Sequence, residues 1–100
     1  MSRVYLLVYS RELGTRTQLK TCLSKLPEVI TWRSELPNSF FLQSDADART
    51  IATAITECIG SETPRFIIAE IQNDSAWGWL VQESWDFIKQ KQKSNLSRTG

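Results

Sequence analysis

The side chains that could do chemistry in this 100-residue chain are carboxylates, hydroxyls and two thiols, because the sequence has no histidine. Without an imidazole, the usual serine and cysteine triads, histidine general bases and most zinc sites are excluded. The four glycines are scattered and form neither a P-loop nor a Gly-x-Gly-x-x-Gly motif, and there is no Cys-x-x-Cys motif. The sequence therefore predicts no nucleotide-dependent chemistry and no cofactor.

Two pairs of carboxylates have the oxygen ligands that Mg²⁺ or Ca²⁺ would need: Asp45 with Asp47, and Glu70 with Asp74. The first pair is better explained as the start of a helix, where acidic groups are favoured. Glu70 interrupts an apolar strand, so its charge has to face solvent, a partner or a basic residue. We favour the solvent-facing or edge position and predict no metal site.

Cys22 and Cys58 each lie on the apolar stripe of a predicted helix, where a free thiol behaves as a small hydrophobic group. We expect both to be buried and reduced, with a disulfide as the less favoured alternative. No apolar run approaches the length of a membrane span, and the first residues lack the features of a signal peptide. These features predict a soluble cytoplasmic protein that does not enter a membrane.

Charge is unevenly distributed along the chain, although the net charge is only +1. Basic residues dominate positions 1–34 and the end of the chain from Lys89, whereas acidic residues dominate positions 35–88. A mixed solvated surface is the simpler explanation, and a nucleic-acid surface is the functional one. The candidate nucleic-acid contacts are Arg11, Arg16, Lys20, Lys89, Lys91 and Lys93.

Three of the four tryptophans fall in a segment near the end of the chain. Its candidate interface residues are Trp77, Trp79, Trp85 and Phe87. Exposed aromatic rings beside a basic tail could stack single-stranded bases. We favour burial against the open face of a sheet instead, either within one chain or across a homodimer.

Apolar periodicity divides the chain into alternating strands and helices. Strands are predicted at 4–9, 29–33, 39–43 and 65–72, and helices at 16–26 and from a cap at Ser44 to Gly60. A last helix is expected from 82 to 91. The helix before Gly60 has the strongest stripe, because apolar side chains recur there at helical spacing.

This order predicts an α+β, ferredoxin-like βαββαβ sandwich, in which an antiparallel sheet has two helices on one face. We expect its first and fourth strands to be central, and a C-terminal Trp-rich extension with a short helix to follow. Residues 1–92 would form a single domain, and residues 93–100 a flexible basic tail.

Several short motifs resemble a known family, the small CRISPR-associated adaptation proteins with a ribonuclease-like ferredoxin fold, together with their uncharacterised bacterial and phage relatives. The similar residues span positions 3 to 88. They are Val8-Tyr9, Arg16, Ser39-Phe40-Phe41, Arg65-Phe66-Ile67-Ile68, Gly78-Trp79-Leu80 and Trp85-Asp86-Phe87-Ile88. The resemblance implies a homodimer in which strand edges and C-terminal segments pair, and a surface that binds nucleic acid.

The chain departs from this family at the position that carries the chemistry. Active members have an aspartate after Val-Tyr, which both subunits contribute to a shared metal site, and here the residue is Ser10. A hydroxyl does not supply the charge that holds Mg²⁺ and activates its water. We therefore predict a non-catalytic homodimeric interaction module that binds nucleic acid or a protein partner. The alternative is a metal-dependent nuclease that uses substitute carboxylates such as Glu12, Glu70 or Asp74.

Overall fold

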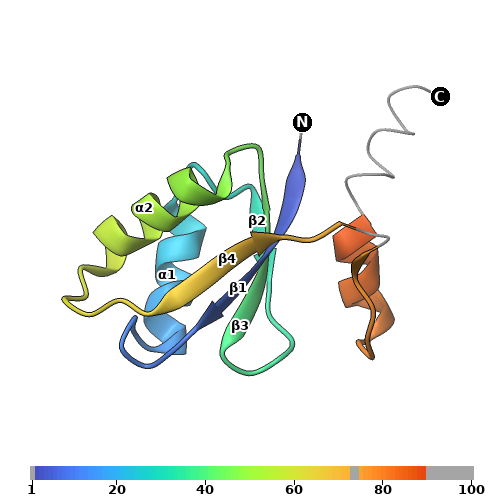
Figure 1. The fold of residues 1–100 in the computed structure, drawn as a ribbon, viewed down its shortest axis with the longest axis horizontal. Coiled ribbons are helices and arrows are strands. Elements are labelled where there is room, and N and C mark those ends of the chain that lie inside the picture. The colour runs from blue at the N-terminus through green and yellow to red at the C-terminus, as the bar shows by residue number, and fades with distance from the viewer. Residues whose placement is uncertain (1, 73–74, 90–100) are drawn as a thin grey trace.

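The computed structural model describes residues 2–72 and 75–89, and this part of the chain forms a four-stranded antiparallel sheet and three helices (Figure 1). The elements in chain order are β1 (Arg3–Tyr9), α1 (Arg16–Lys25), β2 (Thr31–Arg33), β3 (Ser39–Ser44), α2 (Ala48–Ile59) and β4 (Phe66–Glu70). A further helix is described from residue 82 to residue 89. The predicted basic tail, residues 93–100, lies outside the described residues.

The strand order is β2-β3-β1-β4, and every neighbouring pair is antiparallel. This arrangement is compatible with the predicted ferredoxin-like fold. The expectation that the fourth strand is central was wrong, because β1 and β3 are central and β4 is an edge strand. The apolar run of β4 suggested burial on both faces, but Ile67 and Ala69 on one face of β4 are exposed.

The main core lies between the sheet and the helices α1 and α2. Tyr5, Leu7 and Tyr9 alternate along β1 toward this side, and Ile51 and Ile55 of α2 meet them. Alternate side chains of a strand point to opposite faces of the sheet, so Val4, Leu6 and Val8 must lie on the other face. We call this other surface the open face, because neither α1 nor α2 covers it (Figure 1).

The cap of α2 corrects one prediction. Asp47, not Ser44, is the N-cap, and its side chain accepts a hydrogen bond of 2.8 Å from the N–H of Thr50. Ser44 is the last residue of β3, where it is fully buried and its hydroxyl donates to the carbonyl of Glu28. Gly60 ends the helix as expected, with a positive φ of 71° that glycine adopts at little cost.

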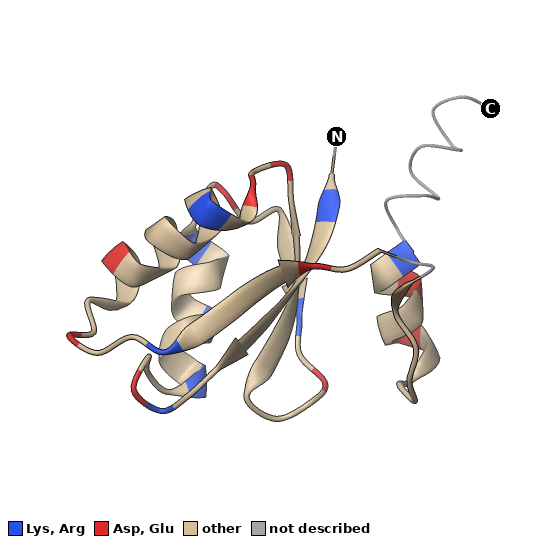
Figure 2. Cartoon of the chain, in the orientation of Figure 1, with Lys and Arg blue, Asp and Glu red and all other residues tan. Residues whose placement is uncertain are grey.

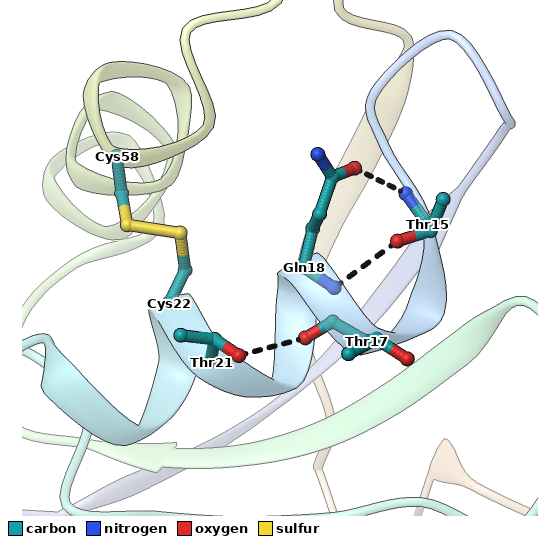
Figure 3. The surroundings of a disulfide bond; sticks show 6 residues. All are labelled: Thr15, Thr17, Gln18, Thr21, Cys22 and Cys58. Carbon is teal, nitrogen blue, oxygen red and sulfur yellow. Dashed lines mark hydrogen bonds between the residues drawn. A yellow bond between two sulfur atoms is a disulfide. The ribbon is translucent and has the colours of Figure 1, made fainter.

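The cysteines are the clearest correction to the sequence analysis. Cys22 of α1 and Cys58 of α2 form a disulfide, with Cα atoms 6.0 Å apart (Figure 3). Both residues were placed on apolar stripes, and the two stripes face each other because α1 and α2 cover the same side of the sheet. The prediction treated each stripe by itself and missed that packing would bring the two sulfur atoms together.

No helix among the described residues has the length and apolar character needed to cross a membrane.

Candidate interaction surface

The C-terminal segment lies on the open face of the sheet, opposite α1 and α2 (Figure 1). Ile88 is buried there against Val4 of β1 and Phe41 of β3. Trp85 and Phe87 are half-buried in the same cluster. Two of the four predicted interface aromatics therefore pack within the chain.

A polar cluster holds this helix to the neighbouring loop. The fully buried hydroxyl of Ser84 accepts a hydrogen bond of 2.7 Å from Nε of Arg33 and donates to the carboxylate of Glu35. Glu35 also accepts from the N–H of Val81, at 3.1 Å from Oε2. A carboxylate at this position satisfies an otherwise unpaired N–H at the start of the helix. The cluster fixes where the helix begins relative to the sheet.

The other two tryptophans are almost fully exposed. The exposed fractions are 92% for Trp77 and 93% for Trp79. Between and beside them, Ala76, Gly78 and Leu80 are half-buried, so exposure alternates with the period of an extended chain. Both side chains therefore lie on the same side of the segment.

A hollow of about 680 Å³ lies beside the two tryptophans. Apolar side chains from the sheet and from the C-terminal segment form most of its lining, and among the lining residues that the structure describes Glu70 is the charged one. Together with Trp77 and Trp79 themselves, the lining includes Leu6, Leu36, Phe41, Ala69, Ile71, Leu80 and Ile88. We call this region the tryptophan hollow.

The exposed apolar surface continues from the tryptophan hollow across the open face. Val8 and Ile67 are cross-strand neighbours on β1 and β4, and 42% and 64% of their surfaces are exposed. Leu36, in the loop between β2 and β3, lines the hollow and is also exposed. Monomeric proteins seldom leave a contiguous apolar surface of this kind uncovered. The sequence analysis named the tryptophans but missed these three residues, although strand alternation placed Val8 opposite the core.

The outer edge of the sheet beside this patch is β4. The N–H of Ile71 donates to the carbonyl of Val4, and the N–H of Ser10 donates to the carbonyl of Arg65. Hydrogen-bonding direction alternates along an antiparallel strand, so the backbone groups of Phe66, Ile68 and Glu70 point away from β1. This edge borders the exposed Ile67 and is continuous with the patch.

Ser10, at the position of the family's metal aspartate, forms hydrogen bonds within the turn after β1. Its hydroxyl donates to Oε1 of Glu12 at 2.6 Å and accepts from the N–H of Glu12 at 3.3 Å. The hydrogen bond from Ser10 is the main reason that the pKa of Glu12 lies below its ordinary value, with a smaller contribution from Arg65. Nε of Arg65 lies 3.8 Å from Oε2 of Glu12. These contacts tie the end of β1 to the residue before β4.

The predicted nucleic-acid contacts within the described residues lie on both sides of the sheet. Arg11, Arg16 and Lys20 are exposed in the turn after β1 and on α1. The guanidinium of Arg16 also stacks on the ring of Phe40, 5.6 Å from its centroid, and donates to Ser34. Lys89 ends the described helix on the opposite side of the sheet (Figures 1 and 2). Lys91 and Lys93 lie outside the described residues.

Two of the candidate carboxylates, Glu12 and Glu70, lie at opposite ends of β4. Glu70 is opposite Tyr5 near the start of β1, whereas Glu12 follows the end of β1 and contacts Arg65. The five residues of β4 between these ends span about 17 Å. Asp47 caps α2, and Asp45 accepts a hydrogen bond from Ser2. Within the described ranges no three potential metal-ligating side chains are grouped, and Asp74 lies outside them.

Comparison of the chain with protein-family models, with curated proteins and with solved structures found no match. The resemblance to the CRISPR-associated adaptation proteins therefore remains a prediction.

Proposed function

We propose that this chain is a non-catalytic interaction module that acts as a homodimer, and that two copies meet through the tryptophan hollow and the adjoining open face. The observation that carries the proposal is the exposure of Trp77 and Trp79 directly beside an apolar hollow. Tryptophan is enriched at the centres of interfaces, where its burial contributes more than that of most residues.

A two-fold dimer fits this surface because each copy carries both the exposed tryptophans and the hollow that could receive the tryptophans of its partner. In such a dimer, each copy uses the same surface, so projecting residues and the hollow that receives them must lie side by side. Trp77 and Trp79 project next to the tryptophan hollow, whose volume of about 680 Å³ can accept aromatic rings from a second copy.

The available area is also sufficient. Four tryptophans, two from each copy, would bury about 600 to 1,000 Å² at ~150–250 Å² each. Val8, Ile67 and Leu36 of both copies add to this area. The total approaches the roughly 1,200–2,000 Å² of a stable interface.

The basic surface of α1 supports nucleic acid as the partner of this dimer. Arg16, Lys20 and Lys25 lie on α1, which carries no acidic residue. Contacts of this kind neutralise phosphates and weaken as salt rises. The tryptophan hollow is less suited to bases, because the described part of its lining includes the carboxylate of Glu70.

The fold and the biological origin of the chain are also part of what we propose. We interpret the chain as a ferredoxin-like domain, of bacterial or phage origin, whose Trp-rich C-terminal extension partly covers the sheet. Localisation in the cytoplasm remains a prediction, and the disulfide favours a more oxidising compartment instead.

Sedimentation velocity over a range of protein concentrations tests the dimer. The wild type should sediment as a dimer at micromolar concentration. Each of Trp77→Ala and Trp79→Ala should weaken dimerisation at least about 30-fold, because a central interface tryptophan contributes ~2 kcal/mol or more. Trp32→Phe is the matched control, since Trp32 packs on the helix side of the sheet against Phe40.

A wild type that sediments as a monomer at micromolar concentration would contradict the proposal. Fluorescence anisotropy with labelled single- and double-stranded RNA and DNA then distinguishes a nucleic-acid partner from a protein partner. Binding that weakens with salt and with Arg16→Gln indicates nucleic acid, whereas no binding at low salt indicates a protein partner.

A further inference from the structure

The disulfide between α1 and α2 lies at the surface of the helix layer, outside the main core. The buried core cluster between sheet and helices includes neither cysteine. Cys22 is 5% exposed, whereas Cys58 is only half-buried. Of the two sulfur-bearing residues, Cys58 is therefore the one that solvent reaches.

A separate hollow of about 270 Å³ opens directly onto this bond. Both cysteines line it, and the remaining lining is mostly polar: Thr17, Gln18, Thr21, Lys25 and Ile59. We call it the cysteine hollow. Figure 3 shows the bond bridging the two helices beside Thr21 and Gln18. A polar hollow of this size admits a small thiol without unfolding of the chain.

Lys25 gives the cysteine hollow a positive charge. It is exposed, lies three residues after Cys22 and therefore projects from the same face of α1. Disulfide exchange proceeds by attack of a thiolate, and the sulfur that leaves does so as a thiolate. A cation beside the leaving sulfur stabilises its charge and also attracts the attacking anion.

We propose that the Cys22–Cys58 disulfide is a thiol-exchange site that a small anionic or neutral thiol reaches through the cysteine hollow. The thiolate of the first small thiol forms a bond with Sγ of Cys58. The bond between the two protein sulfurs breaks, and its electron pair goes to Sγ of Cys22, beside Lys25. A second small thiol then attacks the mixed disulfide. Its thiolate bonds to the sulfur of the first small thiol, the bond from that sulfur to Sγ of Cys58 breaks, and its electron pair goes to Sγ of Cys58. The two small thiols leave joined as a disulfide, and the two protons that they lost on ionising are taken up by the two cysteine thiolates.

The proposal is distinct from the dimer, because the cysteine hollow lies between α1 and α2, on the side of the sheet opposite the tryptophan hollow (Figure 1). The exchange site makes the cross-link between the two helices reversible under native conditions. Its reactant is defined by chemistry, as a low-molecular-weight thiol.

The test is the rate at which glutathione reduces the full-length protein in native buffer, followed by alkylation and mass spectrometry. The rate should rise in proportion to thiol concentration and stay unchanged in low urea. Lys25→Gln should slow the reaction about threefold or more, through weaker stabilisation of the leaving thiolate. Lys20→Gln is the matched control, because Lys20 is an exposed lysine of α1 that does not line the hollow.

Three results would overturn the proposal. The first is a rate that becomes independent of thiol concentration and rises with urea, since reduction would then require unfolding. The second is a Lys25→Gln variant that reacts as fast as the wild type. The third is protein that contains free thiols after oxidative purification, which would remove the bond itself.

Discussion

Ser10 and Glu12 show how single residues hold the end of the first strand. The hydroxyl of Ser10 donates to the carboxylate of Glu12 and lowers its pKa below the ordinary value of 4.5. A carboxyl group whose pKa is lower in the folded state stabilises the fold above its unfolded pKa. That contribution disappears as the pH falls through the folded value.

Ser10→Ala should therefore destabilise the protein more at pH 7 than at pH 3. Below the folded pKa of Glu12 the carboxyl group is protonated in both proteins, so the charge-assisted part of the difference is lost. Urea denaturation of both proteins across this pH range measures the difference. The hydrogen bond that the N–H of Glu12 donates to Ser10 does not titrate, so a smaller difference should remain at low pH. A constant difference at every pH would contradict this explanation.

Ser44 and Ser10 also show what could not be predicted from the sequence. A serine followed three residues later by an aspartate suggested that Ser44 caps α2, but the strand continues through Ser44 and the cap moves to Asp47. For Ser10 the sequence indicated that a metal-binding carboxylate is missing, but it did not predict the hydrogen bonds with Glu12 and with the carbonyl of Arg65. In both cases the residue types were informative, and the local backbone decided which role each residue took.

Among the elements, the helix at residues 82–89 depends on a buried polar contact. Ser84 links the guanidinium of Arg33 to the carboxylate of Glu35, and its own side chain is fully buried. Ser84→Ala would leave both charged groups without this partner, at a cost of about 1–3 kcal/mol.

Loss of the Ser84 hydrogen bonds should release the helix at residues 82–89 locally from the sheet. Hydrogen exchange should become faster across residues 82–89 in Ser84→Ala, while α1 and α2 keep wild-type protection. Ser24→Ala serves as the control, because Ser24 is on α1, on the other side of the sheet, where its hydroxyl accepts a hydrogen bond from Nε1 of Trp32. Equal protection of residues 82–89 in the variant and wild type would show that apolar packing alone holds the helix.

The apolar periodicity predicted the strands and helices but not the order of the strands in the sheet. Every predicted strand and helix within the described residues has a counterpart in the structure, because apolar spacing reports which face of an element is buried. The fourth strand was placed centrally from the βαββαβ order of the elements, and its apolar run agreed with burial, but the structure leaves Ile67 exposed at the edge. Local composition cannot separate a strand buried in the core from one that exposes apolar side chains at an edge.

At the scale of the whole molecule, the disulfide closes a loop between residues 36 positions apart. Cross-linking a loop of this length restricts the unfolded chain and stabilises the folded state by about 4 kcal/mol. This is a large share of the stability of a domain of 100 residues.

Replacing both cysteines, as Cys22→Ser with Cys58→Ser, should therefore lower the free energy of unfolding by about this amount. Guanidinium denaturation of the double variant and of the oxidised wild type measures the difference. The reduced wild type should resemble the double variant. If oxidised and reduced wild type unfold at the same denaturant concentration, the bond does not contribute to stability.

The exposed apolar surface around the tryptophan hollow also depends on the whole molecule. It joins Trp77 and Trp79 to Val8, Ile67 and Leu36, from parts of the chain that are distant in sequence. The tryptophans could be identified from the sequence as interface candidates. The patch and its hollow could not, because they depend on how the C-terminal segment lies across the open face.

Radical footprinting with mass spectrometry, at low and high protein concentration, tests the central claim most directly. The dimer predicts that Trp77 and Trp79 are oxidised rapidly in dilute protein and become protected as concentration rises. Trp32 is the internal control, because it packs against Phe40 on the helix side of the sheet and should react equally at both concentrations. Equal oxidation of Trp77 and Trp79 at every concentration would contradict the proposal that they form the interface.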